Sequence, residues 1–124
     1  MKILTADTLT ALHRLMTDAS GGSHGLRDRG LLESAAASPH QAFGDVEAYP
    51  TLDEKAARLC YALVANHAFV DGNKRIGVLA MLTLLALNGE PIHPDDGALI
   101  ALGLGAAAGE LSYADILSFI KKYR

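Results

Sequence analysis

An apolar run from Ile76 to Leu87 is the feature that most constrains the fold of this chain. A helix that crosses a bilayer needs about 20 apolar residues, so this run is too short to span a membrane. It has the length of a buried helix in a globular protein, and the Asn88-Gly89 pair that follows is a typical helix end. The run therefore predicts a central helix that the rest of the chain must cover.

The remaining sequence consists of helical segments joined by short links. Apolar residues recur every three or four positions, and a side chain that can cap a helix precedes each segment. Internal repeats and convincing strand pairs are absent. We predict an all-α fold of about six helices that forms one domain over residues 1–124. The expected starts are Thr5 or Asp7, Asp28, the capping box Thr51-Leu52-Asp53-Glu54, the motif described below, Asp95 or Asp96, and Ser112 with Asp115.

Two segments without apolar periodicity separate the early helices. Ser20–Gly25 is rich in glycine, but it follows no predicted strand and lacks the lysine of a phosphate-binding loop. A plain flexible connector is therefore the better interpretation. Pro39–Pro50 is expected to be an exposed loop or a small flap. In the first helix we expect an apolar face made of Leu9, Leu12, Leu15 and Met16.

The composition restricts the partners and the compartment. The net charge is −3, whereas non-specific nucleic-acid binding needs an excess of basic residues, so no direct nucleic-acid contact is expected. The N-terminus lacks the apolar core of a signal peptide. Cys60 is the only cysteine and lies in an apolar helical pattern. We therefore expect a buried, inert thiol in a soluble, cytoplasmic protein with no membrane association.

The densest polar chemistry lies in His67-Ala68-Phe69-Val70-Asp71-Gly72-Asn73-Lys74-Arg75, directly before the apolar run. Asp71 is a suitable N-cap for the helix that follows. Gly72 can adopt backbone angles that other residues reach only at a cost. The amides of residues 72–75 would then point out of the helix start and form a nest for an anion.

The charges of the motif also favour an anion. Lys74 and Arg75 would stand at the positive end of the helix dipole, at a cost of roughly 0.3–1 kcal/mol each, which a bound phosphate chain would offset. Magnesium commonly accompanies such a chain, and Asp71 is the nearest carboxylate ligand. A neutral imidazole at His67 could accept a proton from an attacking hydroxyl. Together these groups indicate phosphoryl or nucleotidyl transfer.

Each of these residues also has a structural interpretation. Taken singly, His67 is a satisfied histidine at the edge of the core, Asp71 is a helix cap, and Lys74 with Arg75 is a solvated face. Phe69 anchors the loop to the core in either case. The conjunction of all of them at this spacing favours the functional interpretation. The other histidines have no metal-ligand spacing, so no structural zinc site is expected.

The motif closely resembles the signature of the Fic/Doc superfamily, and of its Doc (death-on-curing) branch in particular. The pattern His-x-Phe-x-Asp/Glu-Gly-Asn-Gly-Arg-x-x-Arg is matched at His67, Phe69, Asp71, Gly72, Asn73 and Arg75. Lys74 replaces the second glycine and Val78 the second arginine, and both departures resemble Doc proteins. The segments Gly25–Ala35 and Gly105–Glu110 are also similar to the Doc branch.

The resemblance implies a compact helical bundle whose active-site loop lies at a helix N-terminus, and the toxin of a type II toxin–antitoxin pair. Such a toxin is a protein serine/threonine kinase that uses ATP and Mg²⁺ to phosphorylate a threonine of elongation factor Tu, which arrests translation. The chain lacks the Ser/Thr-x-x-x-Glu-Gly/Asn pattern of an inhibitory helix, so we expect a Phd-like antitoxin to act in trans. Fic-type AMP transfer and a non-catalytic, antitoxin-binding corepressor remain alternatives.

The resemblance also implies roles for the catalytic residues. His67 would be the general base toward the target hydroxyl, and Asp71 would hold the magnesium that accompanies ATP. Arg75 and the side chain of Asn73 would contact phosphates.

Further roles follow for the nucleotide and the target. Gly72, Asn73 and Lys74 would form the anion hole, and Lys74 would discriminate γ-phosphate transfer from AMP transfer by obstructing the Fic-type nucleotide pose. The loop from about Phe43 to Tyr49 would correspond to a flap that aligns the target segment.

Overall fold

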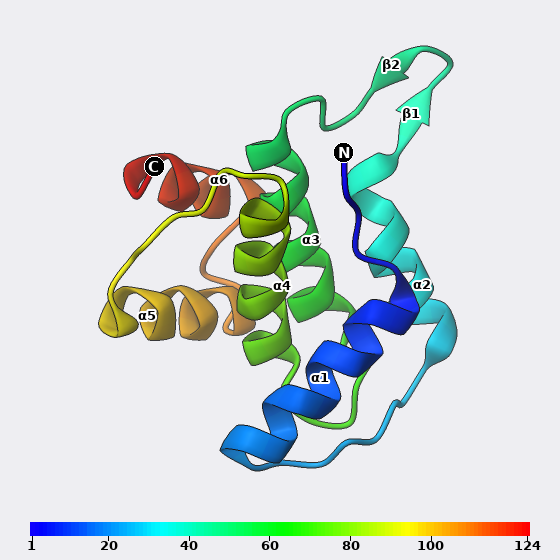
Figure 1. Cartoon of the computed structure of the whole chain (residues 1–124), viewed down its shortest axis with the longest axis vertical. Coiled ribbons are helices and arrows are strands. Elements are labelled where there is room, and N and C mark those ends of the chain that lie inside the picture. Colours follow the sequence, from blue (N-terminus) through cyan, green and yellow to red (C-terminus); the bar gives the residue numbers. More distant parts are fainter.

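The computed structural model describes all residues from 1 to 124 and places the apolar run at the centre of the molecule (Figure 1). α4 (Asn73–Leu87) packs along α3 (Leu52–Asn66), which precedes it in the chain, and this is the most extensive helix contact in the protein. The α4 side chains that are almost fully buried are Ile76, Ala80, Met81, Leu84 and Leu85. The prediction of a central helix is therefore confirmed.

Four helices cover this pair on two sides. Figure 1 shows α1 and α2 on one side, and α5 and α6 on the other. With six α-helices and one small sheet, the structure confirms the all-α prediction. The bounds of the remaining elements are α1 (Ala6–Ser20), α2 (Arg29–Ala37), the 3-10 helix η1 (Ser38–His40), β1 (Ala42–Phe43), β2 (Val46–Glu47), α5 (Asp96–Ala107) and α6 (Tyr113–Lys122).

Local capping sets most of the helix starts. Thr51 and Ser112 form complete capping boxes with the third residues of their helices. The side chains of Thr5, Asp28 and Asp95 each accept a hydrogen bond from a first-turn amide. These starts agree with the sequence analysis because a cap depends only on residues within one turn of each other.

The predicted apolar face of α1 is partly wrong. Leu15 is 66% exposed, and the buried stripe runs instead through Leu9, His13 and Thr17. These three residues are spaced by one helical turn, so they share a face that Leu15 does not occupy. A histidine and a threonine thus take core positions that apolarity alone could not assign.

The segment before α3 contains a β-hairpin, which the sequence analysis expected only as a loop or flap. β1 and β2 pair antiparallel, with Phe43 opposite Val46. Lys55, only 5% exposed, donates to the Glu47 carboxylate and the Tyr49 carbonyl and so fastens the base of the hairpin to α3.

The predicted role of this hairpin as a flap over the motif is not supported by its position. The hairpin lies beyond the first turn of α3, whereas His67 follows its last turn (Figure 1). Fifteen helical residues separate the two ends, which is about 22 Å along the axis. The hairpin in this conformation is therefore too distant to align a target hydroxyl with His67.

The close contact between α3 and α4 depends on Gly77. A Cβ atom at this position would lie 2.7 Å from Val64 Cγ2 and 3.1 Å from the Cys60 carbonyl oxygen. We expect Gly77→Ala to lower the free energy of unfolding by about 1–3 kcal/mol, because the helices must separate.

The matched control is Gly103→Ala in α5, where a Cβ atom would make ordinary contact with Val78 at 3.7 Å. This change should be neutral or stabilising by up to roughly 1 kcal/mol through helix propensity. Urea denaturation of the two variants measures the difference, and equal midpoints would contradict this account of the α3–α4 contact.

Cys60 lies inside the same helix pair. Its side chain is fully buried, and burial raises the pKa of the thiol to about 12. The prediction of a buried, unreactive thiol is confirmed, because only the thiolate is an effective nucleophile. None of the helices combines the length and the apolarity that a membrane crossing requires.

Candidate active site

The motif loop begins where α3 ends, at His67. This residue has φ 51° and ψ 47° and is the only non-glycine residue with positive φ. The left-handed conformation stops the helix and leaves the His67 side chain exposed. Arg27 fastens this helix end, since its Nε donates to the His67 carbonyl at 2.7 Å and its Nη2 to the Asn66 carbonyl at 3.3 Å.

The segment directly before α2 lies beside the motif loop and is hydrogen-bonded to it. The amides of Arg27 and Asp28 donate to the Ala68 carbonyl at 2.8 and 3.0 Å, and the Val70 amide donates to the Gly25 carbonyl at 2.9 Å. These bonds pair the segment before α2 with the loop in an antiparallel bridge. The backbone of the motif is thus held by residues about 40 positions earlier in the chain.

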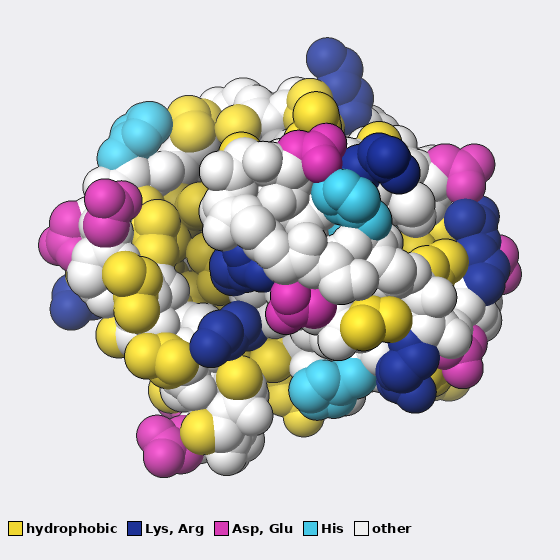
Figure 2. Space-filling model, turned by 90° about the horizontal axis from the view of Figure 1, so that it is seen from below, with side chains coloured by type: hydrophobic (Ala, Val, Ile, Leu, Met, Phe, Trp, Pro, Cys, Tyr) yellow, Lys and Arg dark blue, Asp and Glu magenta, His cyan; other side chains and the backbone are white.

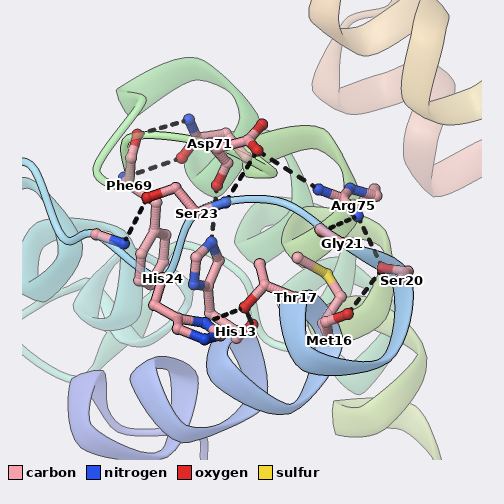
Figure 3. A network of polar contacts seen from close by, with 12 residues as sticks. His13, Met16, Thr17, Ser20, Gly21, Ser23, His24, Phe69, Asp71 and Arg75 are labelled. Atoms are coloured by element: carbon pink, nitrogen blue, oxygen red, sulfur yellow. Dashed lines mark hydrogen bonds and ion pairs between the residues drawn. The ribbon is translucent and has the colours of Figure 1, made fainter.

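Phe69 anchors the loop, as the sequence analysis expected. Its side chain is 1% exposed, and its ring stacks on the ring of His13 with centroids 3.8 Å apart and an interplanar angle of 6°. His13 Nε2 also lies 2.7 Å from the carbonyl oxygen of Asp71, so this nitrogen must carry the proton and donate it (Figure 3).

The side chain of Asn73 is hydrogen-bonded to the backbone of Phe69 in the same loop. Its side-chain oxygen accepts from the Phe69 amide at 3.0 Å, and its side-chain nitrogen donates to the Phe69 carbonyl at 2.9 Å. Each of these atoms makes one hydrogen bond within the loop, and the side-chain NH2 group has a second N–H that no protein group accepts. A contact between this side chain and a phosphate stays a prediction, and the backbone N–H of Asn73 is a second donor to a ligand.

Asp71 does not cap α4, contrary to the sequence prediction. The N-cap is Gly72, with φ 76° and ψ 21°, and no side chain accepts from the first turn. Within the protein, the amides of residues 72–75 have no hydrogen-bond acceptor. Because nothing else binds them, these N–H groups and the positive end of the helix dipole are available to an anion.

The charged side chains beside this nest are held by the last residue of α1 and the loop that follows it (Figure 3). Asp71 Oδ2 accepts from the Ser23 amide at 3.2 Å and lies 3.9 Å from Arg75 Nη2. Arg75 Nη1 donates to Ser20 Oγ at 2.8 Å and to the Gly21 carbonyl at 3.1 Å. The interpretation of this loop as a plain connector is therefore wrong.

Lys74 lies at the rim of an apolar groove between α1, α4 and α5. The groove has a volume of about 450 Å³, and Lys74 and Arg75 are its only charged residues. Figure 2 looks at this end of the molecule and shows hydrophobic side chains gathered beside Lys and Arg side chains. The apolar residues that line the groove are Met16, Val78, Leu79, Leu82, Leu99, Ile100 and Leu104.

His67 faces a different hollow. This pocket of about 400 Å³ lies between the end of α3 and the α5–α6 junction, and its lining includes Tyr61, Ala106, Glu110 and Leu111. The motif therefore has an imidazole on the side of a partly polar pocket and two cations on the side of the apolar groove.

Comparison with known proteins identifies the family. The model described as the Fic/DOC family matches residues 3–85, which is more than half of the chain. The chain belongs to the Fic/Doc family. Two curated proteins, both named Doc, are similar to this Fic/Doc chain and support the Doc branch.

One of these relatives is Toxin Doc of Mycolicibacterium smegmatis, which is 47% identical over 77 residues. That match covers 62% of the chain but only 59% of the relative, so it spans less than two thirds of that protein. The other is Protein kinase doc of Escherichia phage P1, which is 31% identical over 122 residues, 98% of the chain and 95% of the relative.

The fold gathers the motif residues of this Fic/Doc chain at one end of the α3–α4 pair, but it adds residues that the sequence analysis missed. His13, Ser20, Ser23 and Arg27 all contact the motif or its charged side chains. The segment Gly25–Ala35 contributed to the family resemblance. The spacing of apolar residues could not predict that Arg27 of this segment binds the His67 carbonyl.

Proposed function

We propose that this chain is the toxin of a toxin–antitoxin pair and acts as a protein kinase. It would transfer the γ-phosphate of ATP to a threonine hydroxyl of a translation factor, with elongation factor Tu as the expected target. The observation that carries the proposal is the set of unpartnered amides at residues 72–75, flanked by His67, Asp71 and Arg75. The names of the two Doc relatives support the same assignment.

Each group of the motif has a separate role in the proposed reaction. The amides at the start of α4 bind phosphate oxygens, and Arg75 and Lys74 neutralise charge on the phosphate chain. His67 accepts the proton of the target hydroxyl, whose oxygen forms a bond to the γ-phosphorus. The bond from that phosphorus to the bridging oxygen breaks, and ADP leaves.

A magnesium ion fits the donors at this site only together with the nucleotide. No group of three or more His, Cys, Asp or Glu side chains could hold a metal ion by itself. Asp71 supplies one half-exposed carboxylate, and Mg²⁺ prefers one or two carboxylates with phosphate oxygens and water. When bound, the ion would neutralise charge on the phosphates.

The deciding experiment incubates the purified chain with Mg²⁺ and elongation factor Tu, in parallel with γ-labelled and α-labelled ATP. Label from γ only supports the kinase. Label from α would make the chain an AMP transferase despite Lys74. Absence of label from either, with nucleotide binding intact, would favour another target or the corepressor.

An antitoxin is the second expected partner, and the apolar groove is its proposed site. Ile100 and Leu104 of α5 are 62% and 53% exposed, although α5 contains almost only apolar and small residues beyond its first turn. A helix that is apolar on all sides normally needs a partner. We expect the apolar face of a Phd-like antitoxin segment in the groove, with an acidic side chain near Lys74 and Arg75.

Ile100→Asp should weaken antitoxin binding roughly 10-fold or more, because it places a charge in the apolar groove. The control is Leu15→Asp, an equally exposed apolar residue (66%) that does not line the groove. Calorimetric titration of the antitoxin measures both variants. Equal affinities would place the antitoxin elsewhere on the surface.

A further inference from the structure

The second half of α1 and the loop after it make four hydrogen bonds with the motif. His13 Nε2 donates to the Asp71 carbonyl, and the Ser23 amide donates to the Asp71 carboxylate. Ser20 Oγ and the Gly21 carbonyl accept from Arg75 (Figure 3). One continuous segment, residues 13–23, therefore holds both the expected metal ligand and the phosphate-binding guanidinium. We name this segment the brace.

His13 is the member of the brace that is buried against the motif. Its side chain is 1% exposed, and one face of its ring covers the ring of Phe69. The ring N–H of a buried histidine needs an acceptor, because an unpaired buried donor costs about 1–3 kcal/mol. The bond from Nε2 to the Asp71 carbonyl at 2.7 Å therefore fixes where that carbonyl points.

The direction of this carbonyl matters for the anion nest. The Asp71 carbonyl and the Gly72 N–H belong to one planar trans peptide unit, so they point in opposite directions. Gly72 has φ 76° and, without a side chain, little resistance to rotation of that unit. A donor that holds the carbonyl toward α1 thus aims the Gly72 N–H away from α1.

The loop part of the brace approaches the charged groups closely. A Cβ atom at Gly22 would lie 2.6 Å from Asp71 Oδ2 and 2.9 Å from Arg75 Nη2. Only a residue without a side chain leaves room for the Ser23 amide to reach the carboxylate. Gly22 is therefore explained by its close approach to the charged side chains of the motif rather than by flexibility alone.

We propose that His13 is a positioning residue for phosphoryl transfer: through its bond to the Asp71 carbonyl it orients the Gly72 amide and the Asp71 carboxylate for the phosphate and its metal ion. This inference rests on the proposed function. His13 itself touches no substrate. Groups that orient a metal ligand commonly change metal affinity or activity 10–100-fold when they are removed.

The test compares His13→Phe with His13→Gln. Phenylalanine keeps an aromatic ring against Phe69 but has no donor, whereas glutamine has an N–H donor at a similar reach and no ring. We expect His13→Phe to raise the Mg²⁺ concentration needed for half-maximal ATP binding about 10-fold or more, and His13→Gln to recover most of that loss. Thr10→Ala, which removes a side-chain bond on α1 away from the motif, is the control.

A purely structural role for His13 predicts a different result. Melting temperatures would then fall for both His13 variants, with Mg²⁺ dependence unchanged in the folded fraction, and that outcome would overturn the proposal. Equal losses of Mg²⁺ affinity in the phenylalanine and glutamine variants would also overturn it, because the donor would not be the relevant group.

Hydrogen exchange of the loop amides separates this proposal from the proposed function. If the wild-type protein bound no Mg²⁺–ATP, the proposed function would be wrong, and a positioning role in phosphoryl transfer would fall with it. Faster exchange of the hydrogen-bonded amides of Phe69 and Val70 in His13→Phe but not in His13→Gln would then still show that the donor orders the loop. With Mg²⁺–ATP binding intact, unchanged exchange in both variants would refute the inference alone.

Discussion

His67→Asn should reduce phosphate transfer to the target by about 10²–10⁴-fold, because the variant removes the proton acceptor of the proposed reaction. Asparagine is chosen because it tolerates the left-handed backbone conformation that His67 adopts at φ 51°. The helix end that Arg27 fastens should therefore persist. Initial rates with γ-labelled ATP measure the effect.

The matched measurement for this variant is its nucleotide affinity and melting temperature, which should remain close to the wild-type values. A rate within tenfold of wild type would exclude His67 as the general base. A large fall in melting temperature would instead indicate that the imidazole supports the loop, although its side chain is exposed.

Phe69→Ala should lower the free energy of unfolding by about 3–5 kcal/mol, a large part of the 5–15 kcal/mol typical of a folded domain. The ring is 1% exposed and stacks on His13, so its removal leaves a cavity beneath the motif. Chemical denaturation measures the change. Phe43→Ala is the control, because Phe43 is 81% exposed on the hairpin and its loss should cost at most roughly 0.5 kcal/mol.

If the two phenylalanine variants had equal midpoints of denaturation, the loop would not be anchored through Phe69. A midpoint shift confined to Phe69→Ala, together with reduced nucleotide binding in the same variant, would connect the core to the anion nest through one side chain.

The sequence predicted the features that depend on neighbouring residues. Thr51 and Ser112 cap their helices because each forms a box with a residue in the next turn. The apolar run was predicted as a central helix because it is too short to span a membrane and ends at a typical helix-stop pair, Asn88-Gly89. The free amides at the start of α4 also followed from local reasoning, since a helix start leaves its first amides without intrahelical acceptors.

The features that the sequence did not predict depend on contacts between distant residues. His13 and Asp71 are 58 positions apart, and Ser23 and Asp71 are 48 apart. Neither pair has a periodic signal. The error about Asp71 as a cap has the same origin, because its carboxylate turns toward the α1–α2 loop and the left-handed Gly72 takes the N-cap position.

His13 and Asp71 lie 58 positions apart, so the ribosome must synthesise most of the chain before the two residues can contact each other. A nascent chain that has emerged only as far as α3 has neither the anion nest nor a carbonyl for His13 to bind. The site forms only after α4 has emerged and packed on α3, with α1 and the loop before α2 against the motif. Chains truncated before α4 should therefore lack the proposed transfer activity, even when they contain all of the first three helices.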